Sequence, residues 1–340
     1  MEKEKLISVP INCDKSGETI EYFKLSRLNN CYDLGRVFTD KINKIEEIDD
    51  DGTVLIAALR SKIKIGKYKF NTLETISNYS DFSLNEKKDI LMAYGMDDLC
   101  TYSLSESKAL EYRALRYIKD LVQINNEYLI SAYYNSPHVN VEPWSNFIMK
   151  SDVYNIVFRA RHDERVNCLC AVGKTHFLSG SMDKTIKYWE ISASSSSKLI
   201  RTFNGHYGFV NCIELYGNDK KKFLSGSCDK TIKLWDLEKG QCLKTFYGHE
   251  CGISTIQVTK NNQILSLSYD GVVKQWDITT NTCMSSFRDD TDAISFFKVL
   301  SSGNLITGLK NGRIKIWSEY KLKFKDEEEK KELKKSCSLS

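Results

Sequence analysis

Histidine, serine and aspartate recur together in this 340-residue chain, and these are the side chains of a hydrolase triad. In such a triad, a histidine takes the proton of a serine nucleophile while the aspartate orients the histidine ring. One set includes His206, a strand serine and Asp229, and similar sets follow His162 and His249. An enzyme needs only one such set. A structural unit that the fold repeats would explain why the set occurs three times. We therefore interpret these residues as structural and predict that the chain is not an enzyme.

Eleven cysteines are scattered along the chain and contain no C-x-x-C pair. Zinc sites are usually built from closely spaced pairs of cysteine or histidine ligands. Cys168 and Cys170 lie near His162 and His176 in the sequence, yet their spacing fits small buried side chains on a strand better. The N-terminus shows no apolar signal segment, so we expect reduced thiols in the cytoplasm, with no metal and no cofactor.

A cysteine at the fourth position from the C-terminus suggests a lipid modification. Cys337-Ser338-Leu339-Ser340 resembles a C-a-a-X prenylation box, in which a terminal serine favours farnesyl. Lysines in the charged tail, residues 321–340, would supply the second signal for binding an anionic membrane surface. The alternative is a coincidental cysteine in this tail. Prenylation would require a eukaryotic cytosol, reached by a native protein or by one delivered from an intracellular bacterium.

The segments that position the histidines and aspartates repeat along the second half of the chain. Four tryptophans mark the repeats at intervals of 46, 41 and 41 residues: Trp189, Trp235, Trp276 and Trp317. An acid or amide precedes each tryptophan by six residues, namely Asp183, Asp229, Asp270 and Asn311. A histidine precedes the first three of these acids, and Asp290 takes its place in the last unit. Alternating β-branched and aromatic runs between turn residues predict short strands joined by tight turns.

These repeats resemble the WD-repeat family of β-propellers. Two units carry both signature dipeptides, Gly205-His206 with Trp235-Asp236 and Gly248-His249 with Trp276-Asp277, whereas Trp189-Glu190 and Trp317-Ser318 depart from the signature. The resemblance implies an all-β ring of blades, each held by a buried network of histidine, strand serine, aspartate and tryptophan. The expected members, besides the serines at 179 or 181, 225 or 227 and 266 or 268, are His162, Asp183, Trp189, His206, Asp229, Trp235, His249, Asp270, Trp276, Asn311 and Trp317.

The first half of the chain lacks the signature dipeptides but keeps the spacing of the strands. Gly66, Tyr102 and the segment 141–144 occupy the tryptophan positions in this interpretation, so we predict three degenerate blades before the four clear ones. Propellers of this family usually complete the last blade with an N-terminal strand, and residues 31–38 would do so here. We therefore predict a single β-propeller over residues 31–320, most simply with seven blades. Residues 1–30 form either a lead segment or part of an eighth blade.

Composition limits the classes of function. Hydrophobic residues make up 41% of the chain and charged residues 28%, which is typical of a globular protein. No run of eighteen apolar residues occurs, so we expect no transmembrane helix. A net charge of +4 is too mild to indicate nucleic acid as the partner.

The resemblance implies a scaffold or adaptor, a monomeric ring that binds other proteins through one face of the disc. The loops that enter the innermost strands would form this face. Its expected contact residues are Arg165, Met182, Tyr207, Phe209, Cys228, Tyr269 and Lys310. Aromatic, methionine and arginine side chains are typical of binding hot spots. The alternative is a propeller with a small-ligand or enzymatic site in its central channel.

Overall fold

The computed structural model describes most of the chain between Cys31 and Trp317. The described residues are 31–36, 41–47, 53–58, 62–67, 74–77, 79, 81–85, 88, 90–94, 99–104, 108–113, 117–125, 127–144, 158–192, 198–259, 262–300 and 305–317. Residues 1–30 and 318–340 lie outside this set. The predicted lead segment and Cys337 therefore also lie outside the described residues.

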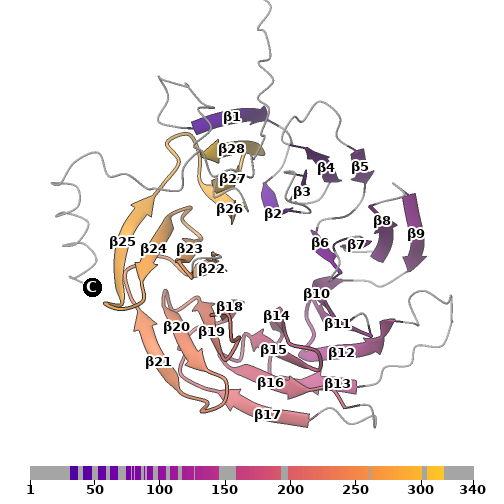
Figure 1. Ribbon diagram of the computed structural model, residues 1–340, viewed down its shortest axis with the longest axis vertical. Helices are drawn as coiled ribbons and strands as arrows, with labels where there is room; N and C mark the ends of the chain where they lie inside the picture. Colours follow the sequence, from indigo (N-terminus) through magenta and orange to yellow (C-terminus); the bar gives the residue numbers. More distant parts are fainter. Residues whose placement is uncertain are drawn as a thin grey trace, which may run out of the picture.

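Six blades are each formed by four consecutive antiparallel strands around one axis (Figure 1). Blade 1 contains β2 (Ile42–Glu47), β3 (Thr53–Ala58), β4 (Lys62–Lys67) and β5 (Glu74–Ser77). Blade 2 contains β6 (Asp81–Leu84), β7 (Ile90–Tyr94), β8 (Leu99–Ser103) and β9 (Lys108–Arg113). Blade 3 contains β10 (Ile118–Ile124), β11 (Tyr128–Tyr133), β12 (His138–Pro143) and β13 (Phe158–Arg161). Blade 4 contains β14 (Val166–Val172), β15 (His176–Ser181), β16 (Ile186–Glu190) and β17 (Lys198–Phe203). Blade 5 contains β18 (Val210–Tyr216), β19 (Lys222–Ser227), β20 (Ile232–Asp236) and β21 (Cys242–Phe246). Blade 6 contains β22 (Ile253–Val258), β23 (Ile264–Ser268), β24 (Val273–Asp277) and β25 (Thr282–Phe287).

A further four-stranded sheet, blade 7, is shared between the two ends of the described chain. It contains β26 (Ile294–Val299), β27 (Leu305–Leu309) and β28 (Arg313–Trp317), and its outer strand is β1 (Cys31–Arg36). Strand β1 runs antiparallel to β28, with Cys31 opposite Trp317. On the inner side, the Ser295 hydroxyl of β26 donates to the carbonyl oxygen of Ile42 in blade 1 at 2.6 Å.

The eight-bladed alternative is wrong. Blade 7 packs directly against blade 1, since β26 and β2 are neighbours at the axis. The ring therefore consists of six blades that are continuous in sequence and one that is composite, and no place remains for a further blade. Pairing with β1 also covers the edge of β28, which would otherwise offer unpaired backbone groups to another chain.

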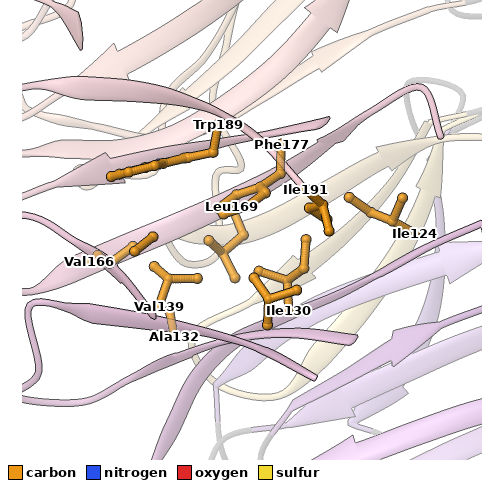
Figure 2. Close-up of a cluster of buried hydrophobic side chains, with 11 residues drawn as sticks. Ile124, Ile130, Ala132, Val139, Val166, Leu169, Phe177, Trp189 and Ile191 are labelled. Atoms are coloured by element: carbon orange, nitrogen blue, oxygen red, sulfur yellow. The ribbon is translucent and has the colours of Figure 1, made fainter. Parts of the chain in front are cut away.

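The apolar core lies between neighbouring blades and not within any one of them. Figure 2 shows the cluster between blades 3 and 4, where Val139 and Ile130 of one blade meet Leu169 and Trp189 of the next. Similar clusters join blade 4 to blade 5 and blade 5 to blade 6. Each blade therefore buries side chains on both of its faces, which stabilises the ring as a whole. No helix in the part of the chain described is long and apolar enough to cross a membrane.

Blades 1 to 3 have other residues where the later blades carry tryptophan. Gly66 lies opposite Val54, the second residue of β3, just as Trp235 in blade 5 lies opposite Phe223, the second residue of β19. Tyr102 follows a bulge in its pairing with the outer strand, as Trp235 does. In blade 3 the residue in this register is Glu142, opposite Leu129, which falls within the predicted segment 141–144.

Candidate partner-binding face and the network beneath it

Blade 5 holds a buried chain of four polar side chains. His206 lies on the loop before β18, with Nδ1 2.7 Å from Asp229 Oδ2 and Nε2 2.7 Å from Ser225 Oγ. Trp235 Nε1 donates to the same serine oxygen at 2.7 Å. Aspartate and histidine stand on loops, while serine and tryptophan stand on β19 and β20, so the bonds tie two loops to two strands. A fully paired buried network of this kind rigidifies the structure around it.

Blade 4 repeats the same arrangement. His162 lies 2.7 Å from Asp183 and 2.8 Å from Ser179, to which Trp189 donates at 2.8 Å. Asp183 also accepts from Thr185, as Asp229 accepts from Thr231 in blade 5. Burial alone raises the pKa of both carboxyls, but the hydrogen bonds from histidine and threonine outweigh it and hold the pKa of each well below its usual range.

The serine, histidine and aspartate in these two blades have triad-like distances but no access for a substrate. Ser179 and Ser225 are both 0% exposed. The oxygen of each is also held by a tryptophan N–H, which would have to be displaced before any attack on a substrate. A nucleophile must reach the reacting carbon, so this geometry serves the fold and not hydrolysis.

Blade 6 differs from the prediction of a third complete network. His249 Nε2 lies 2.7 Å from Ser266 Oγ, and Trp276 donates to that oxygen at 2.8 Å. Asp270, however, accepts from the Ser268 hydroxyl and from the backbone N–H of Val272. In blades 4 and 5 a threonine occupies the position of Val272 and binds the aspartate, so the valine removes one of the contacts that hold the carboxylate beside the histidine. His249 Nδ1 is consequently buried with no hydrogen-bond partner among the described residues.

We expect His249 to make stability fall in mild acid. Burial, with the nearby Lys274, lowers the pKa of His249 to about 3, whereas an unfolded histidine has a pKa near its usual 6.5. The neutral form is favoured by folding, so this contribution is complete above about pH 6.5 and is lost as the pH falls toward about 3. Between pH 7 and pH 5 it amounts to about 2 kcal/mol. The test is urea unfolding of the wild type and His249→Gln at both pH values. An equal loss in the two proteins would contradict the assignment.

Blade 7 replaces the histidine network with a buried ion pair. Lys315 Nζ lies 2.8 Å from Asp289 Oδ2, and Trp317 Nε1 donates to Thr307 Oγ1 at 3.0 Å. Asn311 accepts from the backbone N–H of Arg313. The sequence pointed to Asp290 at this position, one residue away from the carboxylate that is used. Thr291 was the missed signal, because an aspartate two residues before a threonine repeats the turns of blades 4 and 5.

All the predicted contact residues lie on one face, where chain segments enter the innermost strands. The backbone N–H of Met182 donates to the Arg165 carbonyl at 2.9 Å, and Cys228 donates to Phe209 at 2.8 Å. Tyr269 and Lys310 make the equivalent bonds, to Gly252 and to Ala293, at 3.0 Å each. In blades 4 to 7 this bond joins the residue after the second strand to the residue before the first strand. We call the surface formed by these loops the loop face.

Three exposed aromatic residues of the loop face were not predicted. In blade 3, Tyr134 donates its N–H to the Tyr117 carbonyl at 2.7 Å, which repeats the bond seen in blades 4 to 7. Tyr247 precedes the Gly-His dipeptide of blade 6 and lies on the same loop as His249. An alignment of blade 3 with blade 4 by the spacing of their strands identifies Tyr117 and Tyr134 as members of this face.

The exposed aromatic side chains of the described residues all lie on this face. They are Tyr117, Tyr134, Tyr207, Phe209, Tyr247 and Tyr269, and they are between 39% and 87% exposed. The other large apolar side chains with comparable exposure are Leu199, Ile200, Leu243 and Met284, and these lie on the outer strands β17, β21 and β25. Aromatic exposure therefore distinguishes the loop face from the rest of the described surface.

The inner strands carry a second group of titratable residues near the axis. Lys298 Nζ lies 2.8 Å from Glu46 Oε1, between blades 7 and 1. Burial raises the pKa of Glu214 to about 7, although Lys298 opposes this shift. Such a carboxyl could exchange a proton near neutral pH, which is the chemistry that a site in the central channel would use. Among the described residues, no group of three or more histidine, cysteine, aspartate or glutamate side chains is placed to hold a metal ion.

Known proteins share these repeats. The family model described as WD domain, G-beta repeat, matches residues 155–190, 197–236 and 240–277. Over 57 residues, 16% of this chain, the sequence is 42% identical to the nuclear distribution protein PAC1 of Candida dubliniensis, and this match spans only 12% of that protein's length. The solved WD40 β-propeller domain of Doa1 has a TM-score of 0.69 at 21% identity, over 86% of this chain and 97% of that domain. The chain therefore carries WD40 repeats of the G-beta type, within a fold shared with a WD40 β-propeller.

Proposed function

We propose that this chain is a non-catalytic scaffold or adaptor that binds protein partners through the loop face. One observation carries the proposal: the exposed aromatic side chains of the described residues gather on this face. Exposed aromatic side chains are typical of binding hot spots, because they bury a large area with little loss of conformational entropy. The polar network beneath the face holds the loops in place, so little ordering is required on binding.

Capture of partners from a eukaryotic cytosolic extract tests the proposal. The full chain is compared with Tyr207→Ser/Tyr269→Ser on the loop face and with a control, Leu243→Ser/Met284→Ser, on the outer strands. Mass spectrometry should show proteins whose recovery falls about tenfold or more in the first variant and is unchanged in the control. Equal recovery with all three proteins, or selective loss with the control, would overturn the proposal.

A site in the central channel is the second candidate function, and Glu214 with its near-neutral pKa is the observation in its favour. The triad-like residues do not support it, since their serines are fully buried. Metabolite capture by the full chain and by Glu214→Gln distinguishes the two candidates. A small molecule retained by the wild type and released by Glu214→Gln, with no protein captured at the loop face, would favour the channel function.

Farnesylation of Cys337 stays a prediction, since this residue lies outside the described part of the chain. In eukaryotic cells, intact-mass measurement should show one farnesyl group on the wild type and none on Cys337→Ser. Cys337→Ser should also move from the membrane fraction to the soluble fraction, because one lipid chain with a basic segment is the minimum for stable anchoring. An unmodified, soluble wild type would contradict this. The outcome is independent of the loop face.

A further inference from the structure

Some of the loop positions nearest the axis carry basic side chains. We define the axial collar as the residue before the first strand and the residue after the second strand of each blade. Among the described residues these positions include Lys41 of blade 1, Arg165 of blade 4 and Lys310 of blade 7, and they include no carboxylate. Lys119 lies two residues after the collar position Tyr117, on β10, with Nζ 5.2 Å from the centre of the Tyr134 ring. Positive charge therefore gathers where the aromatic loops converge.

The collar cations are not neutralised by neighbouring acids. Within the described part of the chain, none of Lys41, Arg165 and Lys310 forms an ion pair. Arg165 Nε is buried with no hydrogen-bond partner in that part of the chain, and Lys310 Nζ lies 3.5 Å from the carbonyl oxygen of Tyr269. Partial burial, with repulsion from Lys310 and Lys119, lowers the pKa of Lys41. Lys41 and Arg165 are thus partly buried without a paired anion, which is an unfavourable arrangement for the isolated ring, whereas Lys310 is exposed to solvent.

The nearby carboxylates are held by other groups or lie further from the axis. Asp183 and Asp229 belong to the histidine networks, and Asp270 accepts from Ser268. Asp292 accepts the backbone N–H of Ala293 at 2.7 Å. Glu164 and Glu250 are exposed on the entering loops, one and two residues before collar positions. Two further carboxylates, Asp81 on β6 and Asp120 on β10, lie near Lys119 on the innermost strands and accept the backbone N–H groups of Phe82 and Leu169. Among the described residues, no acid stands at a collar position itself.

We infer that the axial collar binds an acidic segment of a partner protein. Carboxylates of the segment lie across Lys41, Arg165 and Lys310, while its apolar side chains pack on Phe209 and Tyr269. This inference rests on the proposed function of the loop face, and it adds the chemistry of the partner. A protein segment fits better than nucleic acid, because the cations form a small central group bordered by exposed acids. A nucleic-acid backbone would need an extended basic track free of such acids.

The test begins with selection of random phage-displayed peptides of about a dozen residues on the full chain. Enriched peptides are synthesised, and their affinities are measured by fluorescence anisotropy at low and high ionic strength. The same measurements are made on Lys41→Gln/Arg165→Gln/Lys310→Gln. A control, Lys174→Gln/Lys198→Gln/Lys239→Gln, removes the same charge from exposed positions away from the loop face. Circular dichroism checks that both variants are folded.

We expect the enriched peptides to be rich in aspartate and glutamate. Their affinity should fall about tenfold or more in the collar variant, remain within about twofold in the control, and weaken as salt is added. Enrichment of neutral or basic peptides, absence of enrichment, or equal binding by the two variants would overturn the inference. Tighter binding of a single-stranded DNA probe than of the peptides, lost in the collar variant, would also overturn it and assign the collar to nucleic acid.

The inference and the proposed function can fail separately. If partner capture depends on Tyr207 and Tyr269 but the selected peptides are not acidic, the scaffold function stands and the collar proposal falls. If acidic peptides bind the collar but partner capture is insensitive to the two tyrosines, the collar proposal stands alone.

Discussion

Replacing Trp235 with alanine is expected to lower the free energy of unfolding by about 4 kcal/mol, because the indole contributes both packing and a buried hydrogen bond. Trp235 is 1% exposed and packs against Phe203 and Phe223, with ring centres 5.7 Å and 6.2 Å away. Its indole also donates to Ser225, the serine shared with His206. The substitution would therefore open a cavity between blades 4 and 5 and remove one member of the network.

Two variants separate packing from hydrogen bonding at this position. Trp235→Phe keeps an aromatic ring but loses the N–H, and it should cost about 2 kcal/mol. Tyr207→Ala, on the exposed loop nearby, should change stability by less than about 0.5 kcal/mol. Urea unfolding followed by far-ultraviolet circular dichroism measures all three. A loss below about 1 kcal/mol for Trp235→Ala would contradict a structural role for the repeated tryptophans.

Replacing Gly226 with valine is expected to cost about 3 kcal/mol, because two blades approach closely at this glycine. A Cβ atom there would lie 2.5 Å from Ile253 Cγ2 and 2.7 Å from Cys212 Sγ. Gly180 and Gly308 occupy the equivalent positions in blades 4 and 7, with contacts to the next blade that are equally short. Blade 6 carries Leu267 at this position, so glycine is required by the individual contact and not by the repeat itself.

A graded series tests the close approach. Gly226→Ala should cost less than Gly226→Val, since it adds only the first of the clashing atoms. Lys198→Val serves as the control, because it adds a branched side chain at an exposed position on outer strand β17. The urea concentration at the unfolding midpoint should be highest for the control, lower for Gly226→Ala and lowest for Gly226→Val. No loss with valine would mean that the blades separate easily and that the ring is not tightly packed at this contact.

Sequence spacing located the strongly patterned blades but could not distinguish neighbouring acids. Trp235 and His206 are marked by type and interval, and they meet at Ser225 as the network requires. Spacing indicates Asp290 as the residue in the histidine position of blade 7, whereas the buried carboxylate is that of Asp289. A loop that is one residue shorter or longer changes which of two neighbouring carboxylates points into the blade. The position of Asp270 depends on a threonine that blade 6 lacks, a local contact that spacing does not report.

The degenerate blades show a second limit of what can be predicted from the sequence alone. Gly66 and Tyr102 were placed by analogy with tryptophan, and their backbone register agrees with that analogy. The exposed pair Tyr117 and Tyr134 was overlooked, because it lies in a blade without the signature dipeptides. Blades hold together mainly through apolar packing between neighbours, which tolerates many residue types, so the strands persist where the polar signature does not.

Hydrogen exchange of the full chain, alone and with a partner that it captures, tests the central claim most directly. If the loop face binds the partner, amides at residues 207–209, 228–230 and 247–252 should exchange more slowly in the complex. Exchange at the opposite turns, residues 173–175, 217–221 and 238–241, should not change. Protection confined to those turns or to the outer strands would contradict the assignment of the loop face as the partner-binding surface.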